Sequence, residues 1–197
     1  MTTTFFTSDH HFDHARIIEL AHRPFVDIEE MRETMVERWN ATVSKSDIVY
    51  VVGDFAMGQI AQSLPIALRL NGKKHLVPGN HDRVWGAYDP KSLDRWTREY
   101  TEAGFVIEPN EIVFDNRFLV CHFPYEGDSH DDDRHVEFRP QRRSYQGLIH
   151  GHVHEEWKVN GDQINVGVDV WDFTPVSYDE VVETLWIAAG YKTKGSD

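Results

Sequence analysis

The sequence predicts an α/β protein in which two packed β-sheets are flanked by helices. The first half of the chain alternates apolar runs typical of buried strands with helix-forming segments, which favours a parallel sheet covered by helices. The second half contains short apolar runs separated by turn residues, which favours a second sheet. With 197 residues and 40% hydrophobic content, the chain can bury a sizeable core. We expect one domain over 1–190 and a flexible tail over 191–197.

In the first half, three apolar runs are typical of buried strands: 5–6, 48–52 and 75–77. Helices are expected between and after these runs. Asp27-Ile28-Glu29-Glu30 resembles a capping box that opens a helix through Ala41. A second helix is predicted from Gln59 to Leu70, where Asn71-Gly72 ends it. A third is predicted from Pro90 to Ala103, closed by Gly104.

From Phe105 onward the pattern changes to short strands and turns. Strands are predicted at 105–108, 111–115, 117–122, 147–153, 156–160 and 163–168. Asn160-Gly161 is a strong hairpin turn, and a last helix is predicted over 178–188. Residues 126–145 form the long irregular segment, and loops of this length in compact domains tend to be functional.

Composition narrows the class of function. A net charge of -13 argues against binding a nucleic-acid polymer through its phosphates, which needs a basic surface. The lone cysteine, Cys121, excludes an internal disulfide framework and is expected to be a core thiol on a strand. The first residues lack the features of a signal peptide, and no run approaches the roughly 20 apolar residues of a membrane helix. We therefore expect a cytoplasmic protein without a membrane partner.

Polar clusters at the ends of predicted strands contain the candidate metal ligands. Four of them directly follow predicted strands and the last lies within one: Asp9-His10-His11, Gly53-Asp54, Gly79-Asn80-His81-Asp82, Cys121-His122 and His150-Gly151-His152-Val153-His154. In open α/β sheets the carboxyl ends of strands meet at one rim, so distant ligands can converge there. Imidazole, carboxylate and amide donors suit divalent transition metals. The sequence therefore predicts a metal site.

The spacing within two clusters supports convergence. Asp9 and His11 are two residues apart, as are His152 and His154, which would place each pair on one side of an extended segment. The glycines in the clusters would let the backbone turn tightly beside a crowded metal site.

The ordered series of these clusters, from Asp9 to His154, resembles the motif series of the calcineurin-like metallophosphoesterases. His22-Arg23-Pro24-Phe25, His122-Phe123-Pro124-Tyr125 and the run from Ile164 to Trp171 are similar to the small single-domain members of bacteria and phages. The resemblance implies the αββα fold of that family, a four-layer sandwich of two mixed β-sheets flanked by helices.

The resemblance also implies roles for single residues. One ion would be held by Asp9, His11, Asp54 and His154, and the other by Asp54, Asn80, His122 and His152. Asp54 and a hydroxide would bridge the two ions. His81 would be catalytic and would reach the substrate together with Asn80, and Asp82 would orient the His81 ring. Four histidine ligands argue against magnesium and calcium; manganese is favoured, and iron and zinc stay open.

The implied activity is hydrolysis of phosphodiester bonds in small phosphorylated molecules, such as 2′,3′-cyclic nucleotides, by the bridging hydroxide. A phosphomonoesterase or nucleotide pyrophosphatase is the nearest alternative. A nuclease disagrees with the net charge, and a non-enzymatic scaffold disagrees with the intact ligand positions. The oligomeric state stays open.

The loop over 126–145 is either a solvated mixed-charge segment or a lid that binds substrate oxygens. Its acidic and basic residues are Glu126, Asp128, Asp131, Asp132, Asp133, Arg134, Arg139, Arg142 and Arg143. Arg139, stiffened by Pro140, is the preferred candidate for binding substrate. Asp169 and Trp171 are candidates to face the cleft, and His10 is expected to point away from it.

Overall fold

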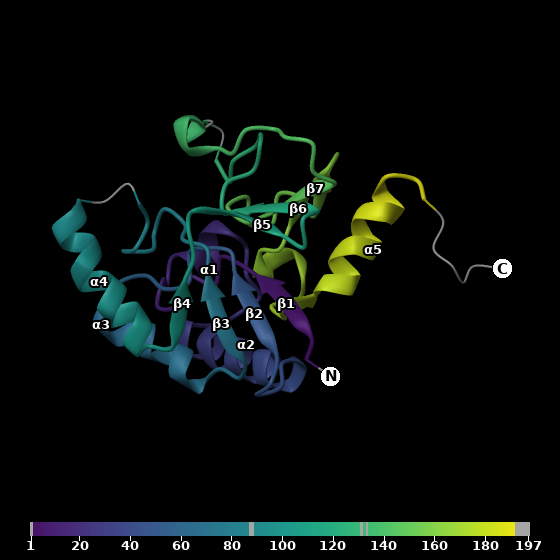
Figure 1. The fold of residues 1–197 in the computed structure, drawn as a ribbon. Helices are drawn as coiled ribbons and strands as arrows, with labels where there is room; N and C mark the ends of the chain where they lie inside the picture. Colours follow the sequence, from purple (N-terminus) through teal and green to yellow (C-terminus); the bar gives the residue numbers. More distant parts are fainter. Residues whose placement is uncertain (1, 87–88, 131, 133, 192–197) are drawn as a thin grey trace.

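The computed structural model describes residues 2–86, 89–130, 132 and 134–191. Within these residues, two five-stranded mixed sheets are flanked by helices, as the sequence predicts (Figure 1). The first sheet has the order β10-β1-β2-β3-β4. Its strands are β1 (Thr4–Thr7), β2 (Ile48–Val51), β3 (Lys73–Leu76), β4 (Phe105–Ile107) and β10 (Val176–Ser177).

The second sheet has the order β5-β6-β7-β9-β8. Its strands are β5 (Glu111–Phe114), β6 (Phe118–Cys121), β7 (Gly147–His150), β8 (Val159–Asn160) and β9 (Gln163–Asn165). β1 to β4 pair in parallel, and so do β6, β7 and β9. Parallel pairing brings the carboxyl ends of neighbouring strands to one edge in each sheet.

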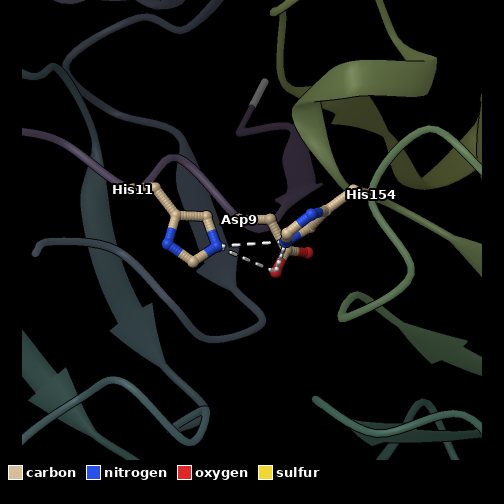
Figure 2. Close-up of side chains that lie close together, drawn as sticks. All are labelled: Asp9, His11 and His154. Atoms are coloured by element: carbon tan, nitrogen blue, oxygen red, sulfur yellow. Dashed lines mark hydrogen bonds and ion pairs between the residues drawn. The ribbon is translucent and has the colours of Figure 1, made fainter. Parts of the chain in front are cut away.

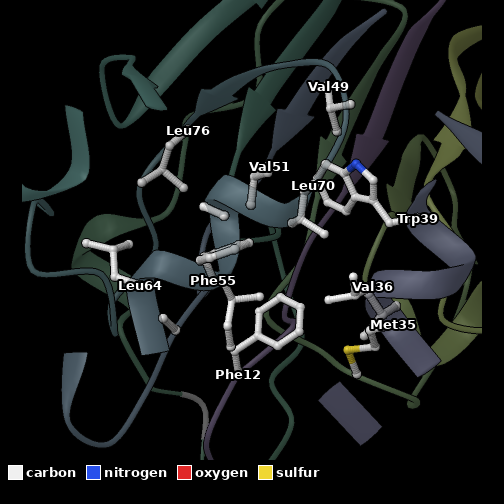
Figure 3. Close-up of a cluster of buried hydrophobic side chains, with 14 of the residues drawn as sticks. Phe12, Met35, Val36, Trp39, Val49, Val51, Phe55, Leu64, Leu70 and Leu76 are labelled. Carbon is white, nitrogen blue, oxygen red and sulfur yellow. The ribbon is translucent and has the colours of Figure 1, made fainter. Parts of the chain in front are cut away.

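Helices cover the outer face of the first sheet: α1 (Ile17–Leu20), α2 (Ile28–Thr42), α3 (Ile60–Ser63) and α4 (Pro90–Glu102). The Asp27 carboxylate caps α2 by accepting from the Glu30 amide, 2.9 Å away. α2 buries one apolar stripe, including Met35 and Trp39, in the same core as Val49 and Val51 of β2 (Figure 3). The predicted helices over 27–41 and 90–103 are thus confirmed within a residue or two.

A second core lies between the two sheets. Alternate residues of the strands point into it, such as Phe6 from β1 and Val120 from β6. α5 (Tyr178–Ala188) begins at a capping box of Ser177 and Glu180 and adds Leu185 to this core. The predicted helix over 178–188 is confirmed.

The outer face of the second sheet is covered by aromatic side chains, including Trp85 and Phe123. Leu119, Cys121 and Leu148 point to this side, where Phe123 packs against them. Cys121 is a buried free thiol whose pKa burial raises to about 12, in agreement with the expected core role. The segment after β6 therefore lies against the same sheet that carries His122.

Several predicted elements differ from the structure. The predicted helix over 59–70 is a short α3 followed by a 3₁₀ helix, Leu64–Arg69. Pro65 has no amide hydrogen for an α-helical bond, so the chain tightens there. The strands predicted over 147–153, 156–160 and 163–168 are shortened to β7, β8 and β9, and α1 and β10 were not predicted.

Some expectations fall outside the described residues: most of the predicted tail over 191–197, and Asp131 and Asp133 of the loop. The prediction of one domain over 1–190 stays a prediction. Among the helices of the described residues, none has the length and apolar character needed to cross a bilayer.

Candidate metal centre

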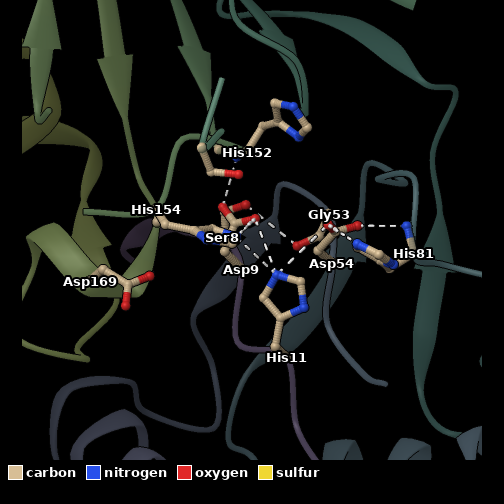
Figure 4. Close-up of polar contacts among 12 residues, drawn as sticks. Ser8, Asp9, His11, Gly53, Asp54, His81, His152, His154 and Asp169 are labelled. Atoms are coloured by element: carbon tan, nitrogen blue, oxygen red, sulfur yellow. Dashed lines mark hydrogen bonds and ion pairs between the residues drawn. The ribbon is translucent and has the colours of Figure 1, made fainter. Parts of the chain in front are cut away.

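The predicted ligands gather where strands of both sheets end. Asp9 follows β1, Asp54 follows β2, and Asn80 follows β3 in the first sheet. His122 directly follows β6, and His152 and His154 follow β7 in the second sheet. Figure 4 shows His11, Asp54 and His154 close to Asp9, although the four residues come from three different segments, after β1, β2 and β7. Among the predicted ligands, the donor atoms of Asp9, His11, Asp54, His122 and His154 lie close together, as expected from the strand-end clusters.

The first group of potential ligands consists of Asp9, His11 and His154, whose donor atoms lie within 4.8 Å of one another (Figure 2). The Nε2 atoms of His11 and His154 are each 3.8 Å from Asp9 Oδ1 and 3.2 Å from each other. Asp9 and His11 are fully buried, while His154 is partly exposed. The three donors therefore face a common point that one cation can fill.

The second group consists of Asp9, Asp54 and His122, again with donor atoms within 4.8 Å of one another. Asp54 Oδ2 lies 3.4 Å from His122 Nε2 and 3.8 Å from His11 Nε2, so Asp54 reaches both groups. Within the part of the chain that the structure describes, Asp9 Oδ1 and His122 Nε2 are buried without a hydrogen-bond partner. Leaving such atoms unsatisfied is costly, and a bound cation would satisfy both.

Burial and neighbouring charges set the protonation of the cluster. Burial lowers the pKa of His11 well below its ordinary value and lowers those of His152 and His154 to about 4. These imidazoles are neutral at neutral pH, which is the form that binds metals. Burial also disfavours charged His122, but the Asp54 carboxylate outweighs burial and raises the pKa of His122 to about 10. Positive charge is therefore favoured beside Asp54, as a cation site requires.

The ligand segments are not extended, which corrects the expectation from residue spacing. Asp9, His11 and Asp54 have φ of 57°, 50° and 55°, and His152 and His154 have φ of 73° and 46°. Residues other than glycine rarely adopt this left-handed conformation, and it is concentrated at functional sites. The ligands converge through local turns after each strand rather than through strand alternation.

Two glycines are required by close approach. A Cβ at Gly79 would clash with the Asp54 carboxylate, and one at Gly151 would clash with Ser8 and the Asp9 carboxylate. The backbone there packs directly on the carboxylates of Asp54 and Asp9. These positions agree with the tight turns expected from the sequence.

His152 and Asn80 lie at the edge of the cluster. The His152 amide donates to Asp9 Oδ2 at 2.9 Å, but the ring Nε2 faces Asp128 Oδ2 at 3.1 Å. Asn80 is half-buried at the tip that follows β3. That these two residues bind metal stays a prediction.

His81 lies beside the cluster and is exposed. Its side chain is 42% exposed, its Nε2 is 3.9 Å from Asp54 Oδ2, and its amide donates to Asp54 Oδ1 at 2.9 Å. Its ring stands 5.4 Å from that of His11. The His81 imidazole therefore lies on the solvent side of the cluster.

Asp82 has a different role from the one expected. Its carboxylate accepts from the amides of Asp54 at 2.8 Å and Gly79 at 2.9 Å, and from Tyr100 Oη at 3.3 Å. It therefore fixes the backbone of the Asp54 turn instead of orienting the His81 ring. The expectation rested on Asp82 being next to His81 in the sequence. The turn directs the side chains of these two residues differently.

Arg139 also has contacts other than those expected. Its Nη2 donates to the backbone carbonyls of Gly127 at 3.0 Å and Arg134 at 3.3 Å. The half-buried guanidinium thus braces the loop from within. Binding of substrate oxygens by Arg139 stays a prediction.

Sequence reasoning missed Arg23 as a supporting residue. Its fully buried guanidinium donates to the carbonyls of Asp9 at 2.7 Å and His10 at 2.9 Å. It also pairs with Asp169 through two bonds of 2.7 and 3.0 Å. Both residues stand in segments that the family resemblance singled out, which was the available signal.

Asn165 supports the other end of the cluster. Its Nδ2 donates to the carbonyls of His154 at 2.8 Å and Trp157 at 2.9 Å. The Trp171 indole donates to the Asn165 carbonyl at 2.8 Å, so Trp171 braces this segment. His10 points away as expected, with its ring stacked on Phe12.

Proteins of similar sequence come from phages and archaea. The gene 66 protein of Mycobacterium phage L5 is 31% identical, over 94% of this chain and 95% of the phage protein. An uncharacterised protein of Methanocaldococcus jannaschii is 30% identical, over 94% of this chain and 92% of its own length. The chain belongs to the family of these proteins. No model of a known protein family matches the sequence.

A solved structure agrees with the fold of this protein. A protein of unknown function from Aquifex aeolicus superposes with a TM-score of 0.67 and 25% identity, over 93% of this chain and 100% of that chain. Phosphopantetheinyl hydrolase from Mycobacterium tuberculosis gives a TM-score of 0.38 and 23% identity over 62% of this chain and 42% of its own. The second similarity is too low to carry any argument.

A large groove lies elsewhere on the protein. A groove of about 1370 Å³ is bounded by α5 and the amino-terminal ends of β6 and β7. It contains none of the clustered donors, so its size does not mark it as the site of chemistry. The candidate metal-ligand groups comprise Asp9, His11, Asp54, His122 and His154.

Proposed function

We propose that the protein is a metal-dependent phosphoesterase that uses two divalent transition-metal ions. One observation carries the proposal: the structure contains two groups of buried imidazole and carboxylate donors. Asp9 belongs to both groups, and Asp54 Oδ2 lies near His11 of the first group and His122 of the second. The similarity of the motif series to calcineurin-like metallophosphoesterases supports the same activity.

The chemistry of the donors fits such ions. Imidazole with carboxylate suits manganese, iron or zinc rather than all-oxygen magnesium or calcium sites. When bound, a pair of ions would activate a water and neutralise charge on phosphate oxygens. Their charge would also attract an anion into a protein whose net charge is -13.

Residues of the chain would bind the ions and donate a proton to the substrate. Asp9 and Asp54 hold the charge that fixes the ions, and His152 and Asn80 complete the set. His81, on the exposed side, donates a hydrogen bond or a proton to the leaving oxygen of the substrate. A leaving alkoxide benefits most from that proton, which favours phosphodiesters of small molecules, such as 2′,3′-cyclic nucleotides, over monoesters.

The first test uses metal-free protein reloaded with manganese, iron or zinc. Hydrolysis of a bis-aryl phosphate, a mono-aryl phosphate and a 2′,3′-cyclic nucleotide should require metal, and the diesters should be preferred. His81→Ala should keep the bound metal and lose about 10²–10⁴-fold in kcat, which is typical for removal of a general acid. Metal content and kcat are measured on the same samples.

His130→Ala removes an exposed histidine of the loop and is the matched control, with metal and turnover unchanged. Hydrolysis that persists in a chelator, or a protein that binds none of these metals, would contradict the proposal. Preference for the mono-aryl phosphate would select the phosphomonoesterase alternative.

A further inference from the structure

The loop after β6 is braced by two arginines. Arg134 binds Asp128 through Nη2 at 2.7 Å, Nε at 3.2 Å and its backbone amide at 3.1 Å. Arg139 donates to the carbonyls of Gly127 and Arg134. Asp128 is therefore held from one side by a network that lies within the loop itself.

Asp128 is buried although its sequence surroundings are charged and polar. Its side chain is 1% exposed, and its Oδ2 lies 3.1 Å from His152 Nε2. Burying a carboxylate requires partners that offset its lost hydration. Arg134 supplies charge, and the His152 ring supplies the remaining bond toward the metal cluster.

Neighbouring rings pack around the His152 ring, in addition to the contact of its Nε2 with Asp128. Its centroid stands 4.9 Å from that of Phe123, 5.3 Å from His122 and 5.8 Å from His135. Figure 4 shows the ring directed away from Asp9 and Asp54. With Nε2 at Asp128, the nitrogen nearer the backbone, Nδ1, is the one left for a metal.

We propose that Asp128 is a positioning residue that holds His152 as the Nε2–H tautomer, with the Nδ1 lone pair presented to the second ion. A carboxylate that accepts from the remote nitrogen of a ligating histidine fixes both ring and tautomer. The loop over 126–139 is thereby tied to the metal centre. The metal part of this inference rests on the proposed function.

The test compares metal binding by the parent protein and Asp128→Ala in calorimetric titrations with Mn²⁺. One of the two ions should bind about 10–100-fold more weakly in the variant, the usual cost of losing such a partner. The ion held by Asp9, His11 and His154 should keep its affinity. Asp128→Asn, whose amide oxygen still accepts a hydrogen bond, should lose less and guards against misfolding of the alanine variant.

Asp132→Ala is the matched control, because Asp132 is an exposed aspartate of the same loop. Combining Asp128→Ala with His152→Ala should weaken the second ion no further than His152→Ala alone. Additive losses would mean that Asp128 acts independently of His152, and they would overturn the proposal.

A second measurement needs no metal. Long-range ¹H–¹⁵N spectra of metal-free protein report the His152 tautomer, expected as Nε2–H in the parent and shifted toward Nδ1–H in Asp128→Ala. An Nδ1–H tautomer in the parent, or an unchanged spectrum in the variant, would overturn the inference even if the phosphoesterase is confirmed. A parent that binds no metal would defeat the proposed function while the tautomer still reports on Asp128.

Discussion

The two halves of the proposed metal centre both combine carboxylate and imidazole donors, but they are supported differently. We define the first half-site as Asp9, His11 and His154, and the second half-site as Asp54, His122 and His152. In the first, the buried Arg23 guanidinium holds the Asp9 backbone from the core side. In the second, His152 is held by Asp128, which belongs to a long loop.

This difference separates a fixed half-site from an adjustable one. Arg23 and Asp169 are almost fully buried, so any displacement of the first half-site would break a buried ion pair. His122 is fixed comparably, with Nδ1 2.9 Å from the Val52 carbonyl. His152 is held by Asp128 of the loop after β6, so changes in that loop should reach the centre through the second half-site.

The largest expected effect comes from removing the residue that spans both half-sites. Asp54→Ala should abolish binding of the ion pair and reduce hydrolysis below detection, because Asp54 Oδ2 faces both His11 and His122. Metal content after gel filtration and turnover after reloading measure the two losses. Asp94→Ala, at an exposed position of α4, is the control. An active Asp54→Ala enzyme would end the two-ion account.

Arg23→Met should cause a smaller loss of metal binding, confined to the first half-site, together with a loss of stability. The variant leaves Asp169 buried without its partner, which should lower the free energy of unfolding by about 3–5 kcal/mol. Affinity for the first ion should fall as well, because the carbonyls of Asp9 and His10 lose their donor. Urea unfolding and Mn²⁺ titration give the two values.

Two further variants separate charge from position. Arg38→Met breaks an exposed pair with Asp172 and should cost less than about 1 kcal/mol. Adding Asp169→Leu to Arg23→Met removes the unpaired charge and should restore much of the stability, but not the affinity for the first ion. Full recovery of that affinity would show that Arg23 does not position Asp9.

Much of this arrangement follows from local sequence. Asp54 and His122 each come within a few residues of an apolar run that forms a buried strand, so their place at a sheet edge could be predicted. The fold class was predictable for the same reason. Pro65 shows the limit even locally, since one missing amide hydrogen turned a predicted α-helix into a short α-helix and a 3₁₀ helix.

The supports of the centre depend on contacts that sequence patterns do not encode. Arg23 and Asp169 are 146 residues apart, and only the folded chain brings them together. Asp128 and Asp132 look alike in the sequence, yet one is buried against His152 and the other is exposed. The left-handed backbone at His152 and His154 likewise results from packing around the carboxylates.

The last comparison concerns the pH dependence of stability and uses two buried histidines, His10 next to Asp9 and His11, and His150 two residues before His152. Burial lowers the pKa of His10 and of His150 to about 3. In the unfolded chain each would take up a proton near the ordinary histidine pKa of 6.5, whereas the folded protein would not. The unfolded state therefore binds more protons below that pH, and stability falls as the pH is lowered toward 3.

Each histidine should contribute a slope of about 1.4 kcal/mol per pH unit to the free energy of unfolding between its two pKa values. Urea unfolding of metal-free protein at several pH values from 4.5 to 5.5, a window chosen roughly midway between these pKa values, measures the total slope. His10→Phe and His150→Phe should each reduce it by about that amount, whatever their effect on stability at neutral pH. The double variant should lose about twice as much, because the two rings flank different half-sites and titrate independently. An unchanged slope in His10→Phe would mean that the His10 ring is protonated in the folded protein. The ring that stacks on Phe12 would then be charged, which would contradict the neutral packing that fixes the first half-site to the core.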